Sequence, residues 1–128
     1  MGYMRHHAIV VTSWDIASLQ HAHDVASGYF DWVSPISPRA MNYYRSFFIP
    51  PDGSKEGWEE SNDGDDARDQ FIEWLELQCY EDGSSCYDWV EVQYGDANLE
   101  TKVIRDSDMC MRREERIQKA LKNVEGKA

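Results

Sequence analysis

Apolar and polar residues repeat along this chain with two periods, and these periods predict where strands and helices lie. The short β-branched run from His7 to Thr12 favours a strand buried on both faces in the middle of a sheet. The segment 89–94 alternates residue by residue between two faces, which indicates a half-buried strand. The segments 43–49 and 99–105 are predicted to be strands as well, and the last forms a hairpin with 89–94 across a turn at 95–98.

Three other segments have the three- and four-residue spacing of amphipathic helices. The first helix is predicted over 14–30, capped by Ser13, and the second over 65–80. A third segment, 109–128, has only a thin apolar stripe, which is typical of a charged helix that docks on a partner chain or frays. A proline-containing connection is expected at 33–39, a strand-ending turn at 50–53, and a polar, mobile loop after it through Gly64.

This order of elements predicts an α+β fold. We expect a four-stranded sheet in the order β-α-β-α-β-β along the chain, with two helices packed on one face and a C-terminal helix beyond it. Residues 1–108 are expected to form a single domain, and 109–128 a charged helix used in oligomerisation or frayed in solution. The pattern does not assign the order of strands within the sheet.

Charge narrows the classes of partner. The chain has 24 Asp and Glu against 13 Lys and Arg, a net charge of −11, which disfavours direct binding of nucleic acid through phosphate contacts. Its acidity either serves solubility or forms a directed surface for a basic partner.

Location and redox state follow from the N-terminus and the cysteines. The N-terminal apolar run, AIVV, is too short for a signal peptide or a membrane span, so the protein is expected in the cytoplasm and not at a membrane. Three cysteines without a CxxC pair, Cys79, Cys86 and Cys110, are expected to be free thiols, although Cys79 and Cys86 could meet across a loop.

Sequence motifs for catalysis, metal or cofactor binding are not found. The chain has no GxGxxG, GxxxxGK[ST] or GxSxG, and the segment 63–66 lacks the spacing of a calcium loop. The four histidines form two pairs, His6 with His7 and His21 with His23, which could suggest a metal site. His21 and His23 would point about 200° apart on a helix, so they are not expected to chelate one ion. We therefore expect no cofactor, no metal and no catalytic residues.

The segment GSKEGWEESNDGDD is the first candidate for a binding surface. It combines a central tryptophan with an acidic rim, which could grip a basic protein surface. The alternative is that the tryptophan folds back over the sheet and covers the core. The expected partner-binding residues are Trp58, Glu59, Glu60, Asp63, Asp65 and Asp66.

Two further groups of residues are alternative candidates for a functional site. Aromatic and Arg side chains on the predicted strands could hold a nucleotide-derived signal between subunits, or could simply form ordinary cross-strand pairs. This alternative ligand-binding set is Arg45, Trp89, Gln93, Asn98 and Arg105. A third reading is a small hydrolase, in which His7 and Asp15 form an acid/base pair.

The stretches HHAIVVTSWD, PDGSKEGWEES and DWVEVQYGD resemble short uncharacterised proteins of tailed bacteriophages and prophages. The resemblance covers about a quarter of the chain and brings no known activity or site residue. It implies a context, because small acidic phage proteins are often inhibitors of host functions and of antiviral defence. The leading hypothesis is therefore a phage-derived, non-enzymatic protein that occupies a basic surface of a bacterial protein. The alternative is an oligomeric module that sequesters a nucleotide-derived immune signal.

Overall fold

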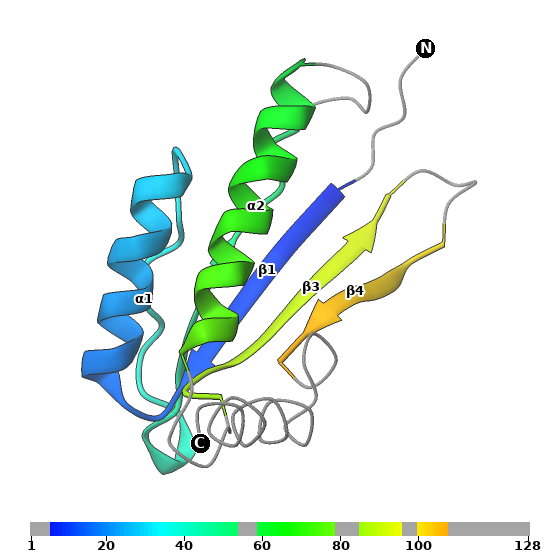
Figure 1. The fold of residues 1–128 in the computed structure, drawn as a ribbon. Coiled ribbons are helices and arrows are strands. Elements are labelled where there is room, and N and C mark those ends of the chain that lie inside the picture. The colour runs from blue at the N-terminus through cyan, green and yellow to red at the C-terminus, as the bar shows by residue number, and fades with distance from the viewer. Residues whose placement is uncertain (1–5, 54–58, 79–84, 96–99, 108–128) are drawn as a thin grey trace, which may run out of the picture.

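Four antiparallel strands form one sheet, and two helices cover one of its faces (Figure 1). The computed structural model describes residues 6–53, 59–78, 85–95 and 100–107, with the side chains of residues 60 and 61 excepted. The predicted α+β class and order of elements are confirmed. The elements are β1 (His6–Ser13), α1 (Ile16–Tyr29), a 3-10 turn (Met41–Tyr43), β2 (Arg45–Ile49), α2 (Glu59–Leu77), β3 (Asp88–Tyr94) and β4 (Lys102–Asp106).

The strand order is β2-β1-β3-β4, so β1 is an inner strand, as predicted. The prediction that β1 is buried on both faces was wrong. Ile9 and Val11 are fully buried under the helices, whereas Val10, on the opposite face, is 36% exposed. The reason is that both helices pack on the same face, and an antiparallel sheet can leave its other face to water.

A long connection joins α1 to β2 because the neighbouring strands β1 and β2 run antiparallel. Helix α1 returns the chain to the end where β1 began, so residues 30–44 must cross the sheet again before β2 can start. On the way, the backbone N–H groups of Ser34 and Ser37 donate to the carbonyls of Phe48 and Ser46 at 2.9 and 2.8 Å. This segment thereby covers the edge of β2, which would otherwise present unpaired backbone groups.

Helix α1 begins two residues later than predicted. Asp15 is its N-cap, and the Asp15 carboxylate accepts hydrogen bonds from the Ala17 backbone and the Ser18 hydroxyl. Ser13 accepts one from the Asp15 backbone instead of capping the helix itself. A carboxylate at this position also interacts favourably with the positive end of the helix dipole.

Helix α2 begins at Glu59, so the predicted loop to Gly64 is wrong for residues 59–64. The acidic residues in these turns are favourable at a helix N-terminus, and the apolar stripe further along fixes the helix against the sheet. Gly64, which suggested a loop, lies inside the helix beside the Asp52 carboxylate, which would have to shift to admit a side chain at this position.

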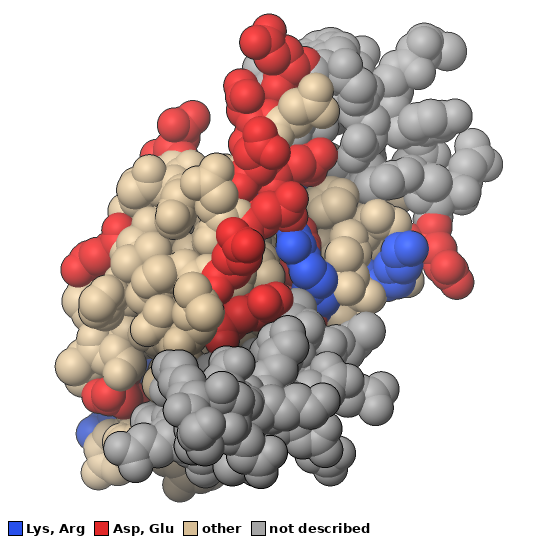
Figure 2. All heavy atoms as spheres, in the orientation of Figure 1, with Lys and Arg blue, Asp and Glu red and all other residues tan. Residues whose placement is uncertain are grey.

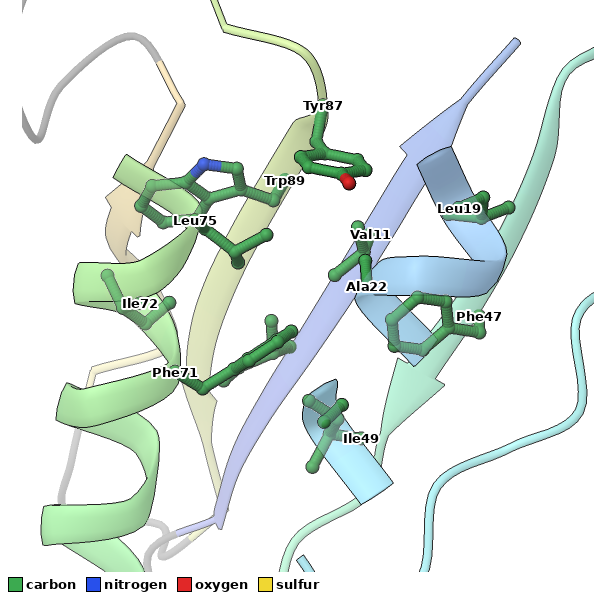
Figure 3. Close-up of a cluster of buried hydrophobic side chains, with 12 residues drawn as sticks. Val11, Leu19, Ala22, Phe47, Ile49, Phe71, Ile72, Leu75, Tyr87 and Trp89 are labelled. Carbon is green, nitrogen blue, oxygen red and sulfur yellow. The ribbon is translucent and has the colours of Figure 1, made fainter. Parts of the chain in front are cut away.

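The core lies between the sheet and both helices (Figure 3). Phe71 of α2 lies at its centre, with its ring 5.9 Å from that of Phe30 and 6.1 Å from that of Trp74. Among the described residues, none of the helices has the length and apolar character needed to cross a bilayer. The buried side chains are Ile9, Val11, Leu19, Ala22, Ala26, Phe47, Ile49, Phe71, Ile72, Leu75, Tyr87 and Trp89.

Candidate functional site: an acidic stripe and the hollow beside it

The solvent face of α2 has a line of carboxylates that runs along the helix (Figure 2). These residues are spaced three or four apart, and that spacing places them on one side of a helix. All except the last are exposed. We call this set the acidic stripe: Glu59, Asp63, Asp66, Asp69, Glu73 and Glu76.

Few cations of the described residues balance the acidic stripe. Asp69 accepts an ion pair from Arg105 at 2.9 Å. Among the residues that the structure describes, no cation lies within 4.0 Å of Glu59, Asp66 or Glu73. Since carboxylates three or four residues apart on a helix repel one another, the stripe costs the free protein stability that a cationic partner could restore.

The one basic residue of α2, Arg68, points inward and not along the stripe. Its side chain is only 8% exposed and is paired with Asp65 on the same helix. Its guanidinium also lies 3.8 Å from a carboxylate oxygen of Asp52 and 3.8 Å from one of Glu91. The positive charge of the helix is therefore used inside the molecule.

Glu91 is the centre of a buried ionic cluster between the sheet and α2. Its side chain is 1% exposed and lies opposite Arg105 in the β3–β4 ladder. Nε of Arg105 donates to Oε1 at 2.6 Å, and Nδ1 of His7 lies 3.5 Å from Oε2. With Arg68, three basic groups from β1, α2 and β4 surround one carboxylate. This convergence ties α2 to the sheet.

Burial and pairing act on the charge of Glu91 in opposite directions. Burial alone would raise the pKa of Glu91, but hydrogen bonds from His7 and Arg105 outweigh it, so that the pKa lies below its ordinary value. Burial would likewise lower the pKa of Arg105, and the Glu91 and Asp69 carboxylates raise it instead. Glu91 and Arg105 are therefore a charged pair at neutral pH.

A hollow of about 540 Å³ opens beside the stripe, where three chain segments meet at one end of the sheet. These segments are the end of α1 with residues 30–32, the residues 49–52 after β2, and the part of α2 from Asp63 to Arg68. Among the described residues, its charged lining consists of three aspartates, Asp31, Asp52 and Asp63, and the guanidinium of Arg68. Tyr29 and Trp32 add aromatic surface that is 40% and 55% exposed.

Apart from Trp58, the predicted partner-binding residues lie on α2 and not on a loop. Glu59, Asp63 and Asp66 belong to the acidic stripe, whereas Asp65 is turned toward Arg68. Glu60 is in the helix, but its side chain lies outside the described residues. Trp58 also lies outside them, so its two predicted roles, binding anchor and core lid, stay predictions.

The alternative ligand-binding residues do not form one site within the chain. Arg45 lies on β2 and Arg105 on β4, which are the opposite edges of the sheet. Trp89 is 3% exposed in the core, and the side-chain amide of Gln93 donates to the backbone carbonyl of Glu100. Asn98 lies outside the described residues. Arg105 is engaged by Glu91 and Asp69, so cross-strand and helix pairing account for its position.

His7 and Asp15 do not meet, contrary to the third reading. They lie at opposite ends of β1, and an extended strand separates residues by about 3.3 Å each. His7 faces Glu91 instead.

The other histidines and the cysteines have packing contacts or lie beyond the described residues. The His21 ring lies 5.5 Å from that of Trp74, and the His6 ring 5.3 Å from that of Tyr94. His23 lies beside Phe47, with Nε2 3.0 Å from the Ser34 carbonyl. Cys79, Cys110 and the whole segment 109–128 lie outside the described residues, so the predicted thiol state and C-terminal helix stay predictions.

The ionic cluster and the hollow were not predicted from the sequence. The available signals were a single Glu inside an alternating strand and a single Arg within a helix that has eight carboxylates. Neither signal names its partner, because Arg68 and Glu91 are brought together only by the packing of α2 on the sheet.

Comparisons with known proteins add no family to this picture. No family model matches the chain, and searches of curated proteins and of solved structures also find no match.

Proposed function

We propose that this chain is a non-enzymatic binding protein that occupies a basic surface of a partner protein through its acidic stripe. The observation that carries this proposal is the separation of charge on α2: five carboxylates of the acidic stripe are exposed to solvent, while the one Arg of the helix is buried against Glu91. A rigid helix holds the carboxylates in fixed positions, which lowers the ordering cost of binding. The acidic face also steers a cationic partner and speeds encounter.

The partner proposed is a bacterial host or antiviral-defence protein, and the chain is proposed to be of phage origin and to act in the bacterial cytoplasm. The support for this context is the resemblance of three short stretches to phage and prophage proteins. A basic, nucleic-acid-binding surface is the kind of bacterial target that an acidic stripe fits, because such surfaces present rows of Lys and Arg.

The test compares two triple variants with the same change in net charge. One neutralises the stripe by Glu59→Gln, Asp66→Asn and Glu73→Gln, and the other neutralises the exposed carboxylates Asp24, Asp88 and Glu100, which lie outside α2. Association with an immobilised nona-arginine peptide is measured at low and at physiological salt. The stripe variant is expected to associate roughly three- to ten-fold more slowly at low salt, and the control close to wild type.

Equal slowing in both triple variants would mean that overall charge, and not the stripe, attracts the cation, and the proposal would be withdrawn. The same pair of variants then serves in capture from bacterial lysate. A specific partner is one that wild type and the control retain and the stripe variant loses.

A further inference from the structure

The hollow beside the stripe is large enough to receive a small ligand or a side chain of a partner. Its volume of about 540 Å³ lies within the range of small-ligand pockets, roughly 300–1,000 Å³. It has an apolar part from Tyr29, Phe30 and Ile49, and a charged part from aspartates. Apolar walls with a few convergent polar groups are typical of pockets that orient a ligand.

The charge of the hollow selects a cation. Among the described residues of the lining, three are aspartates and one is a cation, Arg68, which is also held by Asp65 and Glu91 outside the lining. Among the described residues, Asp31 and Asp63 have no cation within ion-pair distance. Within the described residues, two carboxylates of the lining therefore lack a paired cation.

Trp32 adds a large and exposed aromatic side chain to the lining of the hollow. Its ring meets that of Phe48 edge to face, at 6.2 Å between centroids and 77° between planes, yet 55% of the residue is exposed. A large exposed aromatic ring beside carboxylates is a favourable setting for a cation, because the ring face attracts positive charge.

From this arrangement we infer that the hollow receives an arginine side chain of the basic partner. The inference rests on the proposed function, since it names one contact within that interface. Arginine fits better than lysine because its planar guanidinium can stack on Trp32 while its N–H groups donate to Asp31 and Asp63. Lysine offers a compact charge without a plane to stack.

The experiment is an NMR titration of the full, ¹⁵N-labelled chain with three blocked tripeptides, Gly-Arg-Gly, Gly-Lys-Gly and Gly-citrulline-Gly. Citrulline has the shape of arginine without its charge. The indole N–H signal of Trp32, assigned with a Trp32→Phe variant, is expected to shift saturably with the arginine peptide. Affinity for the lysine peptide should be roughly two- to five-fold lower. The citrulline peptide should cause no saturable shift.

Variants separate the hollow from the rest of the stripe. Asp31→Asn, at an exposed residue, is expected to weaken arginine binding several-fold, whereas Glu73→Gln, in the stripe but outside the hollow, should leave it unchanged. No shift at Trp32, or equal responses to arginine and citrulline, would overturn the inference. The proposed function has its own test, because Glu59, Asp66 and Glu73 do not line the hollow.

Discussion

Glu91 shows how one residue can be essential to the arrangement without adding much net stability. Placing a carboxylate in a site with 1% exposure costs solvation, and the Arg105 and His7 contacts recover that cost only while all partners are present. Such clusters favour one arrangement over others, because a shifted register or a displaced α2 would leave a charge buried alone. The cluster also fixes Arg68, which lines the hollow.

Glu91→Gln is expected to lower the free energy of unfolding at pH 7 by about 3 kcal/mol, since it leaves partly buried guanidinium groups without their carboxylate. Chemical denaturation measures the loss. The control Glu100→Gln, at an exposed residue, should change stability by less than about 0.5 kcal/mol.

The same variant tests the pKa direction. The folded pKa of Glu91 is depressed below its ordinary value of 4.5, so its stabilising effect is complete above pH 4.5. As pH falls further, the unfolded state takes up a proton first, and the effect is lost as pH passes through the folded pKa. The gap in unfolding free energy between wild type and Glu91→Gln should therefore narrow below pH 4.5. A gap that stays constant down to pH 3 would contradict the depressed pKa.

At the scale of the element, repulsion between carboxylates along the solvent face of α2 lowers the stability of this helix. Glu73 lies four residues after Asp69 and three before Glu76, so it has a like charge on each side. Glu73→Gln is expected to raise unfolding free energy by about 0.5 kcal/mol at low salt. Thermal denaturation at low and high salt checks this, and the gain should shrink as salt screens the repulsion.

The matched control is Glu59→Gln, at the opposite end of the same helix. The helix N-terminus favours a carboxylate there, so the same loss of charge should bring no gain. A gain equal to that of Glu73→Gln would show that net charge, and not position on the helix, decides the effect.

Elements were predictable where a period was uninterrupted, and their ends were not. The apolar spacing of α1 and the alternation of β3 were enough to predict both elements. The start of α2 was missed because Gly64 and its acidic neighbours suggest a loop when only local preference is considered. Alternation also cannot say which face of β3 is buried. Val90 and Val92 suggest one face, but the helices cover the face of Trp89 and Glu91.

Only the negative charge of the candidate site could be predicted from the sequence. The acidic segment was identified from composition, and its residues do form a surface, although on a helix. The hollow needs three segments separated by up to 39 positions, from Tyr29 to Arg68, and no local pattern reports such a convergence. The same holds for Arg45 and Arg105, which lie on opposite edges of the sheet because β1 and β3 come between their strands.

For the whole molecule, the helices divide the surface into two unlike sides. The side of α2 presents the acidic stripe (Figure 2), while the opposite face of the sheet exposes apolar side chains such as Val10, Phe48 and Val103. Residues 34–37 shield the β2 edge through hydrogen bonds, which limits strand pairing with other chains. The acidic stripe lies on the helical side, whereas the ring of Trp32, which lines the hollow, meets that of Phe48 from the opposite face.

Because the protein has an excess of negative charge, salt is expected to stabilise its folded state and to weaken its binding to a cationic partner. With a net charge of −11, self-repulsion opposes the compact state, whereas the most buried ion pairs are shielded from solvent and respond weakly to added ions. Raising sodium chloride from about 20 to 500 mM shortens the Debye length to well under 10 Å, so the melting temperature should rise while affinity for nona-arginine falls steeply. Thermal denaturation and binding isotherms in the same buffers measure both trends. A melting temperature that falls with salt would mean that internal ion pairs outweigh repulsion, and the stripe would then not be a cost that a partner relieves.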